Sequence, residues 1–163
     1  WSWMNRNASR WFRKVATLRH AADMAHRYVL WVDSDCVLKR EVPLHFVVSQ
    51  LRGKGFFYFR AHRPAPETGV IGIDMAAGGR EFVAALCERY VSRKYLEYER
   101  WDDGYIVGTL IDDKTVGGFD VCRGKQYPRN HIIPLTTWAK FLDHNKGAHG
   151  RRLDADGKEP IMR

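Results

Sequence analysis

The stretch YVLWVDSDCVLKRE, residues 28–41, joins a run of strand-forming apolar residues to two aspartates that are one residue apart. The apolar run Tyr28–Val32 has the length of a strand, and an unbroken apolar strand is typical of a sheet covered on both faces. Such coverage favours a mostly parallel sheet flanked by helices, and therefore an α/β fold. Asp33 and Asp35 would then emerge at the carboxyl end of a strand, where open α/β sheets bind their ligands.

These two carboxylates predict a site for a divalent cation. Like charges at such close spacing repel each other unless a positive charge lies between them. Hard oxygen ligands suit Mg²⁺ or Mn²⁺, and such an ion usually shares its remaining positions with substrate phosphates. The alternative is a solvated turn in which an aspartate caps the backbone, and Asp-x-Asp by itself favours that interpretation. The apolar strand before Asp33 shifts the balance toward the metal site.

Composition sets broad limits on the kind of protein. The chain has 163 residues, enough for one domain with a sizeable core, and its net charge of +8 suits an anionic ligand such as nucleic acid, a membrane surface or a phosphorylated small molecule. Its three cysteines, Cys36, Cys87 and Cys122, lack the CxxC spacing of a zinc site and do not suggest a disulfide framework. We therefore expect a reducing compartment, the cytoplasm. No apolar run is long enough to predict a membrane-spanning segment.

The remaining pattern predicts alternating helices and strands in a single domain over residues 1–150, followed by a polar tail over residues 151–163. Expected helices cover Ser9–His26, Pro43–Leu51, Arg80–Leu96 and Asp102–Ile111, and expected strands cover Tyr28–Val32, Gly55–Arg60, Val70–Asp74 and Phe119–Cys122.

A second candidate site is RWDDGYIVG, residues 100–108. Asp102 and Asp103 stand at the start of a predicted helix, where acidic side chains cap free backbone N–H groups. The functional interpretation is a carboxylate that faces a cleft and accepts a proton. Trp101 beside them offers an apolar face for a sugar ring, or belongs to the core. The sequence leaves both pairs of alternatives open.

A third is DHNKGAHGRR, residues 143–152, in which cationic side chains crowd around two glycines. Glycine lets the backbone approach a ligand closely, and the cations suit a diphosphate. The alternative, a basic and solvated loop, is favoured by this segment taken alone.

Together these motifs resemble the nucleotide-sugar glycosyltransferases of the GT-A fold. VLWV followed by Asp33-Ser34-Asp35 is similar to their DxD motif. ETGVIGID, GREFVAAL and YLEYERWDDGYIV resemble the middle of small glycosyltransferase-like proteins of bacteria and large viruses, and PLTTWAKFLDHNKG resembles their C-terminal His-x-Lys-Gly segment. RWFRKVATLRHA resembles the lysine-bearing helix before the DxD strand. The resemblance spans residues 7–152, nearly the whole chain.

The resemblance implies a GT-A-like (Rossmann-like), mixed and mostly parallel sheet flanked by helices, and a donor site with a metal ion. Asp33, Asp35 and His144 would hold Mn²⁺ or Mg²⁺, and the ion would bind the diphosphate of a UDP- or GDP-linked or similar sugar. The residues that match the family's donor-binding positions are Lys14, Asp33, Lys146, Gly147 and Arg151.

The resemblance also implies a catalytic base and an acceptor side. Asp103 matches the second acid of the family's xED pattern, which in inverting members takes the proton of the acceptor hydroxyl. Here Asp102 replaces the usual Glu, so the choice between Asp102 and Asp103 stays open. Glu67 and Trp101 match the side that binds a glycan or another hydroxyl acceptor.

The chain departs from the GT-A pattern in the segment before the DxD motif. GT-A domains begin with a strand and a loop that bind the nucleotide base well before the DxD motif, whereas about one helix precedes it here. We therefore expect that the nucleotide-binding strands are missing from this chain.

Two other classes of function stay open. A metal-dependent nucleotidyl or phosphoryl transferase would use the same acidic pair and basic cleft. A basic nucleic-acid-binding module would fit the net charge, but its cations should form one stripe, and here they are scattered among acidic motifs that repel phosphates. We therefore expect no nucleic-acid partner.

Overall fold

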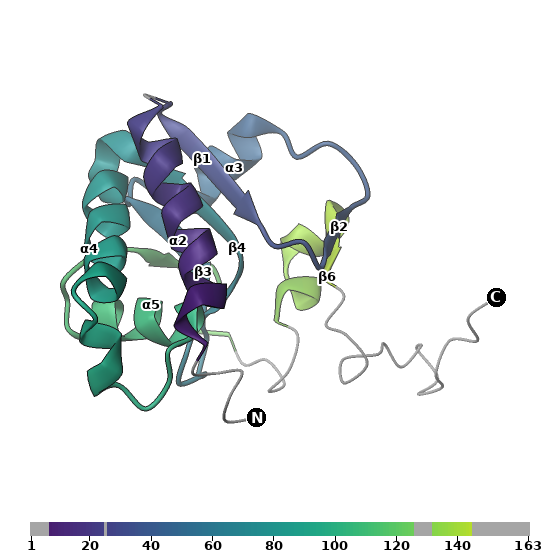
Figure 1. The fold of residues 1–163 in the computed structure, drawn as a ribbon. Coiled ribbons are helices and arrows are strands. Elements are labelled where there is room, and N and C mark those ends of the chain that lie inside the picture. Colours follow the sequence, from purple (N-terminus) through teal and green to yellow (C-terminus); the bar gives the residue numbers. More distant parts are fainter. Residues whose placement is uncertain (1–6, 25, 126–131, 145–163) are drawn as a thin grey trace.

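The computed structural model describes residues 7–24, 26–125 and 132–144, and its centre is a mixed sheet of four strands. The order across the sheet is β1-β4-β3-β5 (Figure 1). The strands are β1 (Tyr28–Val32), β3 (Phe56–Phe59), β4 (Glu67–Asp74) and β5 (Phe119–Asp120).

The prediction of a mostly parallel sheet is wrong. Strands β1 and β3 both run antiparallel to β4, while β5 runs parallel to its neighbour β3. The run on which this prediction rests, β1, is an edge strand whose five residues are only partly buried, whereas β3 and β4 are buried along their whole length. Apolar content therefore does not tell which way the strands run. Residues 60–66 between β3 and β4 are too few for the crossover of about a dozen or more residues that parallel neighbours need.

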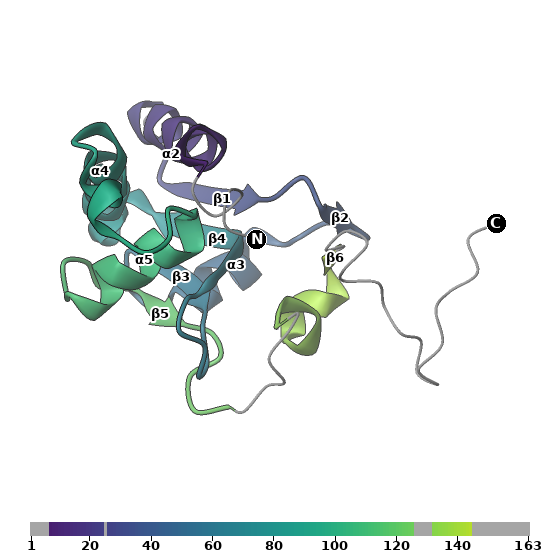
Figure 2. The same cartoon turned by 60° about the horizontal axis from the view of Figure 1, so that its bottom comes forward.

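Helices cover both faces of this sheet, as expected for an α/β chain (Figure 2). One face packs against α2 (Ala8–Asp23), α4 (Arg80–Val91) and α5 (Asp103–Asp112), and the other against α3 (Leu44–Leu51) with the short 3₁₀ turns η3 (Ile133–Leu135) and η4 (Thr137–Lys140). Alternate residues of a strand supply the two cores. Phe56 and Tyr58 enter the first, and Phe57 and Phe59 enter the second.

Most predicted elements are confirmed with small shifts of their ends. Strand Tyr28–Val32 has the predicted bounds, and β4 begins three residues earlier than predicted. The predicted helix Arg80–Leu96 is divided into α4 and the 3₁₀ turn η2 (Lys94–Glu97), and a short π-helical turn, η1 (Met75–Gly79), precedes it. The polar tail, residues 151–163, lies outside the described residues.

A second, two-stranded sheet is absent from the sequence predictions. It consists of β2 (Cys36–Leu38) and β6 (Leu142–His144), which pair antiparallel with Cys36 opposite His144. In Figure 1 this small sheet lies beyond the arrowhead of β1. It places the end of the described chain beside the two aspartates that follow β1.

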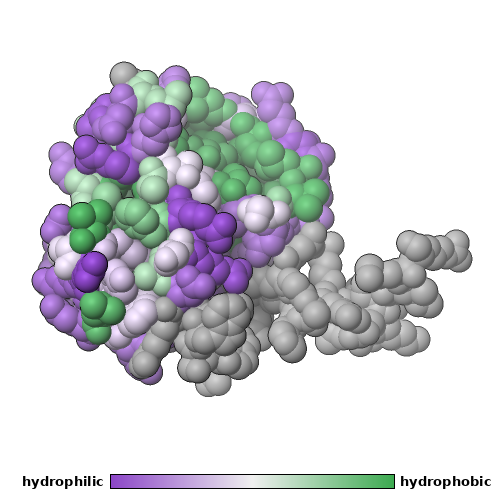
Figure 3. Space-filling model, viewed as in Figure 1, coloured by the Kyte–Doolittle hydropathy of each residue, from purple (hydrophilic) through white to green (hydrophobic). Residues whose placement is uncertain are grey.

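The surface near β2 carries exposed apolar side chains. Val37, Leu38 and Leu44 are each more than half exposed, and Figure 3 shows apolar surface over this part of the molecule. In the part of the chain described, no helix has both the length and the apolar character needed to cross a membrane.

Candidate functional site

The turn after β1 is fixed to the start of β4. The β1–β4 ladder ends with Val32 opposite Val70, and the N–H of Asp33 then donates to the carbonyl of Gly69 at 2.8 Å. The N–H of Cys36 donates back to the carbonyl of Asp33 at 2.9 Å, which closes a tight turn around Ser34 and Asp35. The backbone thus holds both aspartates at the edge where β1 leaves the sheet.

The negative charge of Asp33 is paired with a lysine of the same chain. Lys14 of α2 is buried, and its Nζ lies 2.8 Å from Asp33 Oδ1 and also contacts the carboxylate of Asp103. The same Nζ donates to the carbonyl of Thr68 at 2.9 Å. Burial by itself disfavours the charged lysine, but the pull of Asp103 and Asp33 outweighs it and raises the pKa of Lys14 above its usual 10.5. Lys14 therefore stays charged between two carboxylates.

The two acids at the start of α5 point to different partners. Asp102 caps the helix, since its Oδ1 accepts the N–H of Tyr105 at 3.0 Å while its Oδ2 accepts Arg100 Nε at 2.8 Å. Asp103 is buried, and its Oδ2 accepts the hydroxyl of Thr68 at 2.8 Å in addition to the contact with Lys14. Asp103 is thus the member of the pair that joins the network around Asp33.

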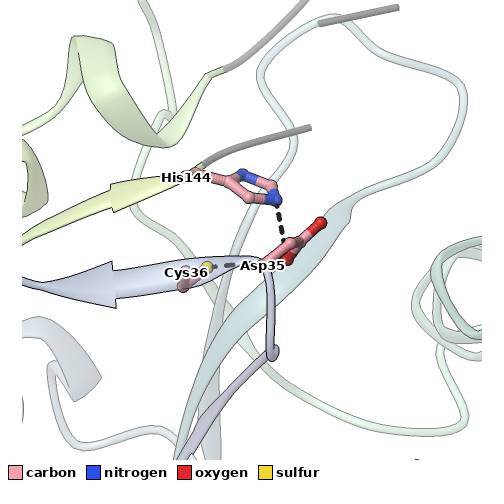
Figure 4. Close-up of side chains that lie close together, drawn as sticks. All are labelled: Asp35, Cys36 and His144. Carbon is pink, nitrogen blue, oxygen red and sulfur yellow. Dashed lines mark hydrogen bonds and ion pairs between the residues drawn. The ribbon is translucent and has the colours of Figure 1, made fainter. Parts of the chain in front are cut away.

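Asp35 lies in a separate cluster with Cys36 and His144 (Figure 4). His144 Nε2 lies 3.5 Å from Asp35 Oδ1, and Cys36 Sγ lies 4.0 Å from the same oxygen. One ligand atom from each of the three residues falls within 4.8 Å of the others. The side chain of His144 is only 1% exposed, whereas that of Asp35 is 45% exposed, so the cluster opens to solvent on the aspartate side.

Negative charge dominates the surroundings of Cys36. Burial, followed by the nearby carboxylates of Asp35, Asp33 and Glu67, raises the pKa of the Cys36 thiol to about 12. The thiol is therefore protonated at neutral pH. A cation bound at this cluster would offset the repulsion among the carboxylates.

Asp35 and His144 fit a divalent metal ion. A carboxylate oxygen and an imidazole nitrogen on facing segments form a donor set that Mn²⁺ accepts, whereas Mg²⁺ prefers oxygen ligands alone. Asp33 is not part of the three-residue cluster, because its Oδ1 contacts Lys14 and also accepts the indole N–H of Trp31. The structure therefore brings together two of the three residues predicted as metal ligands.

The first residues of β4 lie between the Lys14–Asp33–Asp103 network and the Asp35–Cys36–His144 cluster. Glu67 is buried, its Oε1 accepts the N–H of Gly69 at 3.2 Å, and its Oε2 lies 3.5 Å from Arg63 Nη1. A Cβ on Gly69 would lie 3.1 Å from Cε1 and 3.2 Å from Nε2 of His144, which is tighter than ordinary packing. Glycine at this position therefore leaves room for the imidazole ring.

Of the other predicted site residues, one packs in the core and three lie outside the described residues. The ring of Trp101 is partly buried and meets Tyr95 edge-on at 5.2 Å, which is core packing, so its role toward an acceptor stays a prediction. Lys146, Gly147 and Arg151 lie outside the described residues, and their roles toward the donor also stay predictions.

Sequence reasoning missed three participants, which are Cys36, Thr68 and Gly69. Thr68 and Gly69 belong to the quoted segment ETGVIGID, but their contacts depend on where α5 and β6 lie. Cys36 carries no metal-site signal in the sequence, because no CxxC pair accompanies it and its partner His144 is far away along the chain.

Comparison of the chain with protein-family models, with curated proteins and with solved structures finds no match. The functional inference therefore rests on the side chains described above.

Proposed function

We propose that the chain is a metal-dependent glycosyltransferase that moves a sugar from a nucleotide-diphosphate donor to an acceptor hydroxyl. One observation supports this most. Residues from distant segments, singled out by the resemblance to GT-A enzymes, lie around the end of β1 and the start of β4, in two groups of contacts. They are Lys14, Asp33, Asp35, Glu67, Asp103 and His144.

In this proposal Asp35 and His144 hold the divalent ion, Mn²⁺ or Mg²⁺, and the imidazole of His144 favours Mn²⁺ of the two. When bound, the ion supplies Lewis-acid stabilisation for the charge that develops on the leaving nucleoside diphosphate. Asp33 acts differently, because its contact with Lys14 and its backbone bonds to Gly69 and Cys36 fix the turn that presents Asp35. Lys14 then acts as a positioning residue, and the donor contacts of Lys14 and Asp33 stay predictions.

Asp103 is the proposed base for the acceptor hydroxyl. Its carboxylate takes the hydroxyl proton as the new glycosidic bond forms, and Lys14 and Thr68 orient the group by holding Oδ2. Asp102 serves as the helix cap.

Asparagine substitutions at the two positions test this assignment. Asp103→Asn should lower transfer by about 10²–10⁴-fold, the usual contribution of a general base, while donor and metal binding persist. Asp102→Asn keeps a good capping side chain and should leave turnover within a few-fold of wild type. Because Asp103 is also a partner of buried Lys14, thermal melts must accompany both assays. A folded Asp103→Asn protein with wild-type turnover would exclude Asp103 as the base.

The function itself is tested with a panel of UDP- and GDP-linked sugars incubated with Mn²⁺ or Mg²⁺ and a mixture of hydroxyl acceptors. The proposal predicts metal-dependent release of nucleoside diphosphate, and its loss in Asp35→Asn. Release of pyrophosphate or nucleoside monophosphate would instead indicate nucleotidyl or phosphoryl transfer. No turnover of any donor, combined with salt-sensitive binding to nucleic acid, would favour the nucleic-acid-binding class.

A further inference from the structure

We propose that Cys36 is a third protein ligand beside Asp35 and His144, and that the site therefore prefers a thiophilic transition metal of the Zn²⁺ and Co²⁺ class over Mg²⁺. The inference rests on the metal site of the proposed function, and it does not depend on the sugar-transfer reaction.

The β2–β6 ladder sets the first two ligands. Cys36 and His144 are directly opposite each other in this antiparallel pair, so their side chains project from the same face of the small sheet. Directly opposed residues have Cβ atoms roughly 4.5–5.5 Å apart, a spacing that one metal ion can bridge. This pairing is a property of the backbone, and it does not require either side chain to leave its strand.

The turn before β2 supplies the third ligand. In a tetrahedral site with Zn–S of ~2.3 Å and Zn–N or Zn–O of ~2.0–2.2 Å, two ligand atoms lie roughly 3.4–3.6 Å apart. The distance between His144 Nε2 and Asp35 Oδ1 is 3.5 Å, and that between Cys36 Sγ and Asp35 Oδ1 is 4.0 Å. All three ligand atoms lie within 4.8 Å of one another, so the side chains must approach one another by up to roughly 1.3 Å to reach this spacing.

The donor set and its exposure decide the kind of metal. A thiolate and an imidazole are the ligands that Zn²⁺ and Co²⁺ favour, and neither suits Mg²⁺. Three protein ligands with solvent on one side leave a fourth position open, which is the arrangement of a catalytic site and not of a closed structural one. When the ion binds Sγ, the thiol proton passes to solvent, so charge is conserved.

Co²⁺ titration followed by absorption spectroscopy tests the ligand directly, because a thiolate bound to Co²⁺ gives a near-ultraviolet charge-transfer band that oxygen and nitrogen ligands do not. The test variant is Cys36→Ser. Cys87→Ser is the matched control, since Cys87 is also a free, partly buried cysteine and packs against the core that includes α4. Wild type and Cys87→Ser should show the band, saturating at one equivalent of Co²⁺. Cys36→Ser should lack it and bind Zn²⁺ at least about tenfold more weakly.

Two results would overturn the inference: Co²⁺ that binds wild type without the band, or a band that survives in Cys36→Ser. If Cys36→Ser does not fold, alkylation of wild type decides the matter. Zn²⁺ should then protect Cys36 from iodoacetamide while Mg²⁺ does not, and equal modification with both ions would contradict the proposal.

The same data separate this inference from the proposed function. If no charge-transfer band forms but Mn²⁺ supports sugar transfer, Cys36 is excluded as a ligand and the proposed transferase function stands. A band in the absence of any donor turnover would leave the metal site in place and remove the transferase. If Mn²⁺, Co²⁺ and Zn²⁺ all fail to bind, both the Cys36 ligand and the proposed metal-dependent transferase are excluded.

Discussion

Asp33 and Asp35 belong to one motif and are one residue apart, yet their surroundings differ. The side chain of Asp33 is 29% exposed, and its Oδ1 contacts the buried Nζ of Lys14 at 2.8 Å. The side chain of Asp35 is 45% exposed and faces Cys36 and His144. The first aspartate is paired with a lysine of the fold itself, whereas the second faces a histidine and a thiol on the solvent side, where the proposed metal ion would bind. Two aspartates of one motif can therefore have different partners, one inside the fold and one toward solvent.

This difference follows from the elements that surround the turn. Lys14 comes from α2, which packs over the face of the sheet, and reaches Asp33 from the buried side. Asp35 faces the imidazole of His144 at the end of β6 (Figure 4). Removing the internal cation should therefore affect folding, whereas changes on the Asp35 side should affect metal binding.

The largest effect is expected from Lys14→Met, which leaves Asp33 and Asp103 without their common cation. Removing one partner of a buried ion pair costs about 3–5 kcal/mol, because the remaining charges stay buried and unpaired. Lys14 qualifies, since its side chain is 8% exposed. Urea unfolding at neutral pH measures the change in the free energy of unfolding.

Lys39→Met is the matched control for that experiment. Lys39 also pairs with an aspartate, Asp143, at 3.2 Å, but its side chain is 40% exposed. Such surface pairs contribute about 0–1 kcal/mol. Equal losses of unfolding free energy in the two variants would show that Lys14 is not an internal counter-charge, and that Asp33 does not differ from an aspartate in a surface ion pair.

A smaller effect is expected from Gly69→Ala. The new methyl group would press against the imidazole of His144 and should destabilise the fold by about 1–3 kcal/mol, the usual cost of overpacking. Metal affinity should fall with it, because the ring is displaced from Asp35. Gly117→Ala is the control, since a Cβ at Gly117 meets nothing within 4 Å among the described residues. Unchanged metal affinity in Gly69→Ala would separate His144 from the site.

The smallest effect is expected from pH, and its sign follows from the raised pKa of Lys14. A raised pKa in the folded state means that the stabilisation is fully present below the unfolded value of 10.5 and is lost as pH rises through the folded value. The difference in unfolding free energy between wild type and Lys14→Met should be constant from neutral pH to about pH 9 and shrink only at higher pH. If the difference in unfolding free energy between wild type and Lys14→Met already narrows below about pH 9, Lys14 does not stay charged in the folded protein.

Several parts of this arrangement could be predicted from sequence, because they are local. The apolar run Tyr28–Val32 predicts its strand, and the acidic pair Asp102-Asp103 predicts the start of α5. Lys14 also carries a signal that could have been used. It is four and eight residues before the buried Leu18 and Ala22 on the same stripe of α2, and a lysine in an apolar stripe needs a buried anionic partner.

The rest depends on contacts between distant segments. Strands β2 and β6 have three residues each, too few for a pattern to predict, and they pair across more than 100 residues of chain. The direction of β4 relative to β1 is likewise invisible in their apolar runs. The grouping of Cys36 with His144, and the separation of Asp33 from Asp35, both follow from these long-range pairings.

The most direct test is calorimetric titration of Mn²⁺, in the presence of a nucleoside diphosphate, into wild type, Asp35→Asn and Asp33→Asn. Loss of a metal ligand should weaken binding by more than the roughly 10–100-fold that outer contacts contribute. Asp35→Asn should show such a loss with stability within about 0.5 kcal/mol of wild type, since an exposed substitution rarely costs more. Asp33→Asn should show a clearly smaller loss of affinity together with lower stability. Equal loss of Mn²⁺ in both variants, or wild-type binding in Asp35→Asn, would contradict the division of the motif.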